Sequence, residues 1–232
     1  MSDERKMTTD VNEYCAIVPA YNEERTIGKV VSAVRSNKID VIVVDDGSDD
    51  NTGKYAEEKG ALLLKNGKNE GKGNALRKGF NFVQEKGYKY FFTIDADAQH
   101  NPKDIPKFIE KMRVTGSDIV AGNRLANPRN MPDDRLAINR WSSSLISKIS
   151  GQYVPDPLCG FRLIRTGVLK KIDLEGKRFE IVPEILIKAS KMGFVIDEVE
   201  IVSIYADETS YIRPLRDGYM FFSFLIKEWI KN

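Results

Sequence analysis

Two carboxylates stand one residue apart in YFFTIDADAQHNP, residues 90–102, at the end of an apolar run. Asp95 and Asp97 repel each other unless a cation lies between them. Alternate residues of an extended segment face the same side, so Gln99 adds a third oxygen if the extended geometry continues. Oxygen ligands suit Mg²⁺ or Mn²⁺, which substrate phosphates usually complete. The segment predicts a divalent metal that holds a diphosphate, and His100 is either a loop residue or a further ligand.

Acids and amides also follow two other apolar runs. YCAIVPA is followed by Tyr21, Asn22 and Glu23, and the run DVIVVDD ends in Asp45 and Asp46. In parallel α/β sheets, ligands bind outside the carboxyl ends of the strands. One acidic strand end is often a helix cap. Three such ends, one of them Asp-x-Asp, predict a binding site.

Hydrophobic periodicity predicts the elements that position these side chains. Short apolar runs alternate with helical segments such as NEERTIGKVVSAVRSN, whose Ile27, Val30, Val31 and Val34 recur at helical spacing. The expected strands are YCAIVPA, DVIVVDD, ALLLK, KYFFTIDAD and SDIVAG. Strands that alternate with helices over about the first 125 residues predict an α/β fold, with a doubly wound, mostly parallel sheet flanked by helices.

Composition limits the class of protein. The 232 residues are 41% hydrophobic and 30% charged, which predicts one sizeable globular domain. A net charge of +2 argues against a nucleic-acid partner. Cys15 and Cys159 lack the spacing of a metal or redox pair, and we expect Cys159 to be a small buried residue. With no visible signal peptide, a reduced cytoplasmic compartment is expected.

The C-terminal segment YMFFSFLIKEWI, residues 219–230, is aromatic but shorter than the ~20 residues that cross a bilayer. It is either a helix docked on the core or an interfacial helix on a membrane, with Trp229 at headgroup level. The expected organisation is a frayed segment 1–13, one domain 14–214 that carries the site, and an amphipathic helix 215–232.

Five segments occur in a recognisable order: VPAYNEERTIGKVV, VIVVDDGSDDNT, NEGKGNALRKGF, FFTIDADAQHNPKDI and DPLCGFRLIRTGVL. This ordered set resembles the inverting family 2 glycosyltransferases with the GT-A fold, and more narrowly the polyprenyl (dolichyl) phosphate sugar synthases. The resemblance extends from residue 14 to residue 218, and domain 14–214 would be the GT-A catalytic domain. It implies metal-dependent transfer of a hexose, with inversion, from a GDP- or UDP-sugar to polyprenyl phosphate.

The resemblance also implies roles on the donor side. Asp97, with Asp95 and Gln99, would hold Mg²⁺ or Mn²⁺, which stabilises charge on the departing diphosphate. Lys72 either reaches the nucleotide or is solvated at a helix start. The nucleotide-sugar site would comprise Pro19, Tyr21, Glu23, Asp46, Lys72, Asp95, Ala96 and Asp97. Pro19, Tyr21 and Glu23 would line the base and ribose pocket. Asp46 would accept a hydrogen bond from the base, and the neighbouring Asp45 would support the loop.

On the acceptor side, a phosphate monoester has a second pKa of about 6, so at neutral pH it needs no general base. It needs a cationic clamp. By the resemblance, Arg124, Arg140 and Ser144 would bind this phosphate, and Asp156 would orient the sugar or an arginine, or hold a turn. The catalytic set would be Asp97, Arg124, Arg140 and Asp156. Arg129 and Arg135 fit surface arginines better, and Arg162 is expected to pack or pair internally.

One segment departs from the family. Related synthases often carry R-x-G-x-S-K before the last helix, where this chain reads YADETSYIRPLRDG. Tyr211 replaces the lysine, so Arg213 would contact the diphosphate or the lipid phosphate. This departure leaves the donor and acceptor details open, as it does the identity of the sugar and nucleotide.

Three alternatives to this function stay open. The protein could be a glycosyltransferase that acts on a sugar hydroxyl with Asp156 as general base, a sugar nucleotidyltransferase, or a binding module without catalytic activity. The nucleotidyltransferase is disfavoured because PAYNEERT replaces the expected glycine-rich loop. The lipid acceptor implies a membrane surface as partner, with a cytoplasmic, peripheral location at the inner face of the membrane. A membrane-protein partner or a homo-oligomer is a further option.

Overall fold

The computed structural model describes residues 13–129, 131–204 and 214–230, so nearly all of the predicted frayed segment lies outside it. One seven-stranded sheet has the order β3-β2-β1-β4-β6-β5-β7. The strands are β1 Tyr14–Ala20, β2 Asp40–Asp45, β3 Leu62–Lys65, β4 Tyr90–Thr93, β5 Ile119–Asn123, β6 Arg162–Arg165 and β7 Ile196–Glu200. The helices are α1 Ile27–Arg35, α2 Thr52–Glu58, α3 Lys72–Lys86, α4 Ile105–Thr115, α5 Asp133–Ser150, α6 Thr166–Leu169, α7 Ile181–Lys191 and α8 Pro214–Ile230, with a short 3-10 helix at Pro102–Asp104. The predicted α/β class and all five expected strands are confirmed.

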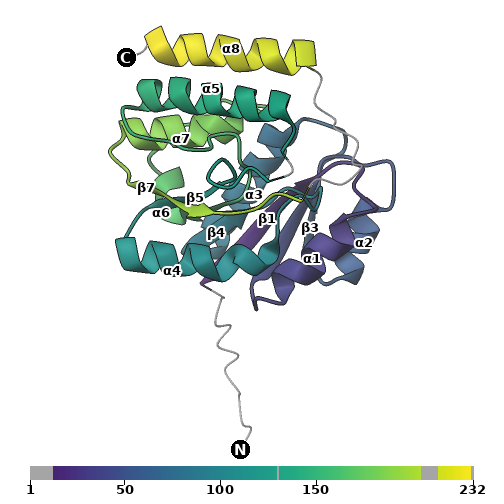
Figure 1. Ribbon diagram of the computed structural model, residues 1–232. Helices are drawn as coiled ribbons and strands as arrows, with labels where there is room; N and C mark the ends of the chain where they lie inside the picture. Colours follow the sequence, from purple (N-terminus) through teal and green to yellow (C-terminus); the bar gives the residue numbers. More distant parts are fainter. Residues whose placement is uncertain (1–12, 130, 205–213, 231–232) are drawn as a thin grey trace, which may run out of the picture.

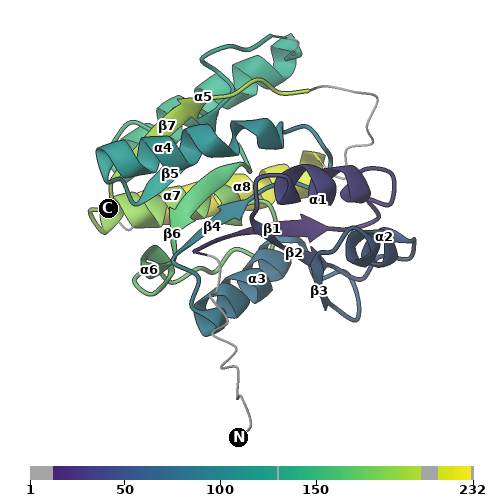
Figure 2. The ribbon, with the colours of Figure 1, turned by 90° about the horizontal axis from the view of Figure 1, so that it is seen from below.

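Helices cover both faces of the sheet, because the strand side chains alternate between two cores. In β1, Cys15 and Ile17 join the core under α3, α5 and α7, whereas Ala16 and Val18 join the core under α1 and α4. Figure 1 shows these layers, and Figure 2 views the molecule from the side of α1 and α4. The apolar residues expected on one side of α1 are all buried.

Strand β6 departs from the parallel pattern. It lies between β4 and β5 and is antiparallel to both, whereas β1 is parallel to β2 and β4, and β5 is parallel to β7. Arg162 is in register with Thr93 on one side and Ala121 on the other. The residues just before β6 are thereby brought against the carboxyl ends of β4 and β5.

Helix α8 docks on α5 and α7, on the side away from the sheet (Figure 1). Leu225 is 3% exposed and joins the core, and the rings of Phe222 and Trp141 lie 5.5 Å apart. Among the described helices, none is long and apolar enough to cross a membrane. The predicted C-terminal helix is present and docked, yet Ile226 and Trp229 on its outer side stay exposed.

Candidate active site

The polar segments after β1, β2 and β4 meet at one edge of the sheet, because these strands are neighbours. The loop after β1 is tied to the loop after β2. The Asn22 amide donates to Ser48 Oγ at 3.0 Å, and the Glu23 amide donates to Thr52 Oγ1 at 2.7 Å. The expected gathering of polar strand ends is therefore present. Tyr21 and Glu23 are half-buried there, next to Pro19 at the end of β1.

Asp46 organises the loop that leads into α3. Its buried carboxylate accepts hydrogen bonds from Asn66 Nδ2 at 2.8 Å and from the amides of Glu70 and Gly71 at 3.0 and 2.7 Å. A carboxylate offers about four acceptor positions, so one is left for a ligand. The bond from Asp46 to a nucleotide base stays a prediction. Asp45 accepts from the Ser48 amide at 2.9 Å, which agrees with its expected role in supporting the loop.

Lys72, the first residue of α3, points at the acidic motif. Its Nζ lies 2.5 Å from Asp95 Oδ1, and His100 Nε2 lies 3.8 Å from Asp95 Oδ2. Although burial acts to raise the pKa of Asp95, the charge of Lys72 and the nearby His100 hold it well below its usual range. Lys72 is therefore paired, and the alternative of a solvated lysine is wrong. Its contact with the nucleotide stays a prediction.

The chain does not stay extended through the motif. Strand β4 ends at Thr93, and the backbone turns at Ala96–Ala98, where Ala98 has a φ of 58°. The Gln99 amide donates to Asp97 Oδ1 at 3.0 Å, closing the turn. The prediction that an extended backbone aligns Gln99 with the two carboxylates is therefore wrong. Gln99 as a metal ligand stays a prediction without that support.

Asp97 differs from Asp95, because its pKa is raised rather than lowered. Burial, and then the charge of Asp95, raise its pKa. In the described ranges, no three His, Cys, Asp or Glu side chains are grouped to hold an ion. Mg²⁺ is commonly held by one or two carboxylates together with substrate phosphates, and Asp97 and Asp95 supply such oxygens. The residues therefore fit a divalent ion that a diphosphate completes.

Gly160 packs directly against Asp95. A Cβ on Gly160 would lie 2.7 Å from the Asp95 carboxyl carbon, and the Gly160 carbonyl accepts from Thr93 Oγ1 at 2.7 Å. Antiparallel pairing of β6 with β4 brings Gly160 to this place. No role for Gly160 was predicted from the sequence, where its only signal is its place two residues before the strand.

Arg124 and Asp156 form a bidentate ion pair at the end of β5. Arg124 Nε and Nη2 donate to Asp156 at 2.7 and 2.9 Å, and the Arg124 amide donates at 3.0 Å. Asp156 is fully buried. This arrangement favours the role of orienting an arginine over that of a general base that reaches a substrate hydroxyl.

The other acceptor-side residues lie on or near α5. Arg140 and Ser144 are exposed and one turn apart on that helix. Their convergence with Arg124 on one phosphate stays a prediction. Arg129 and Arg135 are exposed, as expected of surface arginines. Tyr211 and Arg213 lie outside the described residues.

Two buried residues behave as expected. Arg162 is 1% exposed and donates to the backbone carbonyls of Val182 and, at 2.8 Å, Pro157. Cys159 is fully buried, and burial raises the pKa of its thiol to about 12. Neither side chain is available for chemistry.

The loop before α7 was not predicted from the sequence to lie near the site. The Lys177 carbonyl accepts from the Asn74 amide at 3.2 Å, and Lys72 Nζ lies 5.7 Å from the centre of the Phe179 ring. Arg178 is half-buried in the same loop. The run KRFE after a glycine was the only signal in the sequence.

The comparisons with known proteins agree with this geometry. The profile described as Glycosyl transferase family 2 matches residues 15–173. The chain is 35% identical over 214 residues to the UDP-N-acetylglucosamine–dolichyl-phosphate N-acetylglucosaminyltransferase of Methanococcus voltae, covering 82% of this chain and 85% of that protein. It is 33% identical over 205 residues to the undecaprenyl-phosphate mannosyltransferase of Micrococcus luteus, covering 81% and 82%.

Solved structures show the same fold. The complex of glucosyl-3-phosphoglycerate synthase from Mycobacterium tuberculosis with UDP superposes with a TM-score of 0.72 at 20% identity, covering 93% of this chain and 79% of that chain. The same synthase with Mg²⁺ and UDP gives a TM-score of 0.67 at 21% identity, covering 94% and 78%. At such identity the likeness concerns the fold alone. With the profile match and the two relatives, it shows that this chain belongs to glycosyltransferase family 2 and has the GT-A fold.

Proposed function

We propose that this glycosyltransferase moves a hexose, with inversion, from a GDP- or UDP-sugar to a polyprenyl (dolichyl) phosphate, and that it depends on Mg²⁺ or Mn²⁺. The observation that carries the proposal is the pair of carboxylates Asp95 and Asp97 at the edge of the sheet, where Lys72 pairs with Asp95 and burial, with the charge of Asp95, raises the pKa of Asp97. The names of the two relatives, a dolichyl-phosphate and an undecaprenyl-phosphate transferase, support a lipid-phosphate acceptor.

On the donor side, a divalent ion bound at Asp97 and Asp95 would neutralise charge on the departing diphosphate. Lys72 lies 2.5 Å from Asp95, and its ammonium would add to that stabilisation. Both contributions grow as the bond to the sugar breaks, which favours the transition state over the bound donor. Tyr21, Glu23 and Asp46 would hold the nucleoside.

On the acceptor side, Arg124 is held by Asp156, and Arg140 and Ser144 lie on α5. A phosphate dianion attacks without losing a proton, so these residues have only to bind and orient it. The burial of Asp156 supports this route over the hydroxyl acceptor. A sugar nucleotidyltransferase would instead release pyrophosphate from a nucleoside triphosphate and a sugar phosphate.

The donor can be identified with a thermal-shift panel of nucleotide sugars and Mn²⁺. A ligand at 100 times its dissociation constant adds about 2.7 kcal/mol to the free energy of unfolding. Transfer from the selected donor to polyprenyl phosphate, followed by product analysis, then tests the reaction. The proposed acceptor would be wrong if the donor binds in a metal-dependent way and its sugar is transferred to a sugar hydroxyl but not to a lipid phosphate.

We further propose that the enzyme works peripherally, at the cytoplasmic face of the membrane. The apolar side chains of α5 and α8 that face outward would meet the lipid surface. They are Ile138, Trp141, Phe222, Ile226 and Trp229, each about half exposed or more. A second copy of the chain or a membrane protein could cover the same side chains instead, and the liposome experiment below separates these outcomes.

A further inference from the structure

The first turn of α3, which carries Lys72, rests on the loop of residues 173–180. Besides the bond from Asn74 to the Lys177 carbonyl, a Cβ on Gly73 would lie 2.5 Å from the Lys177 carbonyl carbon. A Cβ on Gly71 would lie 2.7 Å from the Lys177 carbonyl oxygen. The two glycines allow backbone to approach backbone, so a shift of the loop would move the start of α3. Lys72 would then move relative to Asp95.

A buried carboxylate on α7 holds this loop in place. Glu184 is fully buried and accepts hydrogen bonds from the amides of Glu175 and Gly176, each at 2.8 Å. Lys188 Nζ lies 2.7 Å from the same carboxylate. A buried charge is costly unless it is paired and hydrogen-bonded, and here both conditions are met. Glu184 therefore fixes the loop by directional bonds that an apolar residue could not make.

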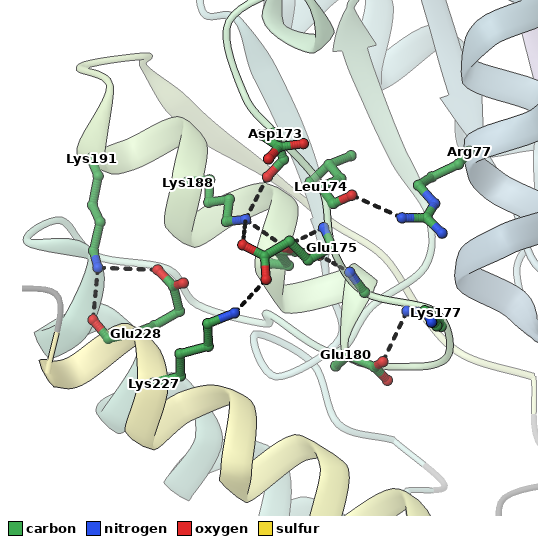
Figure 3. A network of polar contacts seen from close by, with 12 residues as sticks. Arg77, Asp173, Leu174, Glu175, Lys177, Glu180, Lys188, Lys191, Lys227 and Glu228 are labelled. Atoms are coloured by element: carbon green, nitrogen blue, oxygen red, sulfur yellow. Dashed lines mark hydrogen bonds and ion pairs between the residues drawn. The ribbon is translucent and has the colours of Figure 1, made fainter.

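Neighbouring hydrogen bonds and an ion pair extend the same network (Figure 3). Glu180 accepts from the Lys177 amide at 2.9 Å, and Lys188 also donates to the carbonyl of Asp173. Lys227 of α8 pairs with Glu175. The loop is thus held from α7 and α8 on one side and contacts α3 on the other.

We infer that Glu184 is a positioning residue for the donor side, acting on Lys72 through the loop of residues 173–180. The inference rests on the role proposed above for Lys72. Glu184 itself lies behind the loop and touches no reacting atom. Its effect is to keep the Lys72 ammonium beside Asp95, where the departing diphosphate is expected.

A double-mutant cycle in the full-length chain tests the inference. Glu184→Gln keeps the side-chain volume but places an amide NH₂ against one of the two backbone amides. We expect kcat with saturating donor and Mn²⁺ to fall about 10-fold, and binding of the nucleoside diphosphate to weaken. In a Lys72→Met background, the same substitution should change kcat less than about 2-fold, because the group it positions is gone.

The control is Lys191→Gln, which removes the ion pair of α7 with Glu228 at 3.2 Å and leaves the loop alone. It should lower the melting temperature without changing kcat. If Glu184→Gln unfolds the chain, Gly73→Ala perturbs the same contact from the α3 side. It should lower kcat in the wild-type background and change it little in the Lys72→Met background.

The outcomes distinguish the inference from the proposed function. Equal losses from Glu184→Gln in both backgrounds would make the effect structural and overturn the inference alone. Wild-type kcat and nucleotide binding in Lys72→Met would refute the role of Lys72 and the inference with it. Loss of metal-dependent nucleotide binding in Lys72→Met, with no transfer to polyprenyl phosphate by the wild type, would count only against the proposed acceptor.

Discussion

Arg124 holds Asp156 by both carboxylate oxygens, and its backbone amide adds a third bond to the same group. Because Asp156 is fully buried, all of its hydrogen-bonding is directed at the protein. A general base must come within hydrogen-bond reach of the proton that it removes. The pair is better suited to presenting a guanidinium to an anionic acceptor.

Asp156→Asn should therefore destabilise the enzyme more than it disables the chemistry. It leaves Arg124 without its counter-charge, which should cost about 3 kcal/mol in the free energy of unfolding, measured with urea. Turnover with polyprenyl phosphate should stay measurable, and Arg124→Met should lower it more. A loss of several orders in kcat by a folded Asp156→Asn variant would favour the hydroxyl acceptor.

Asp97→Asn should abolish metal-dependent nucleotide binding while stabilising the apo enzyme. Since burial and Asp95 raise the pKa of Asp97, the folded state holds its proton more tightly than the unfolded chain does. The stability of the wild type then falls as the pH rises from the ordinary carboxyl pKa to the raised pKa of the folded state and stays lower above it, and the neutral amide avoids that loss. The gain should be present at pH 7 and vanish as the pH falls below the ordinary carboxyl pKa of about 3.9.

Calorimetry with Mn²⁺ and UDP or GDP, and melting curves of the apo enzyme between pH 3 and neutrality, check both parts of this prediction. A variant that binds nucleotide with wild-type metal dependence contradicts the metal assignment. A variant less stable than the wild type at neutral pH contradicts the electrostatic argument instead.

Gly160→Ala should damage the site without unfolding the chain. The added Cβ would lie 2.7 Å from the Asp95 carboxyl carbon, so the carboxylate has to shift, which disturbs its pairing with Lys72. We expect a loss of about 10-fold or more in kcat/KM for the donor. The matched control is Gly167→Ala on α6, where no atom lies within 4 Å of the new Cβ. Equal activity of the two variants would refute this packing argument.

The sequence predicted what depends on repeated local patterns. Apolar runs alternating with helical periodicity identified five strands, and the acids after them identified the edge of the sheet where polar strand ends gather. Geometry that depends on distant residues was not predictable. Strand β6 is four residues long, and its antiparallel place between β4 and β5 arises from pairing across the sheet. The turn that displaces Gln99 depends on the positive φ of Ala98, which no local pattern predicts. Glu184 resembles an ordinary polar helix position until α7 is packed.

The docked C-terminal helix calls for point substitutions rather than truncation in a test of membrane binding. Leu225 and Glu228 are buried, and Lys191 pairs with Glu228. Deleting the chain from Tyr219 onward would therefore remove part of the core. We expect such a truncation to unfold, as the docked-helix interpretation predicted.

Replacing the outward side chains separates docking from membrane binding. Ile226 and Trp229 are 61% and 54% exposed, so Ile226→Ser with Trp229→Ser should leave the melting temperature and nucleotide-sugar binding nearly unchanged. Co-sedimentation with acceptor-free liposomes and transfer to long-chain polyprenyl phosphate should both fall, because interfacial binding scales with buried apolar area. Val114→Ser on α4, 69% exposed on the other face of the sheet, is the matched control and should bind liposomes as the wild type does.

The salt dependence of liposome binding tests its physical origin. A net charge of +2 gives little electrostatic attraction to anionic lipid, so raising the salt concentration should release only a small part of the bound enzyme. If the wild type stays in the supernatant at low and high salt, the exposed face of α5 and α8 does not bind lipid by itself. A dimer in sedimentation equilibrium that the double substitution dissociates would then assign that face to a second copy of the chain.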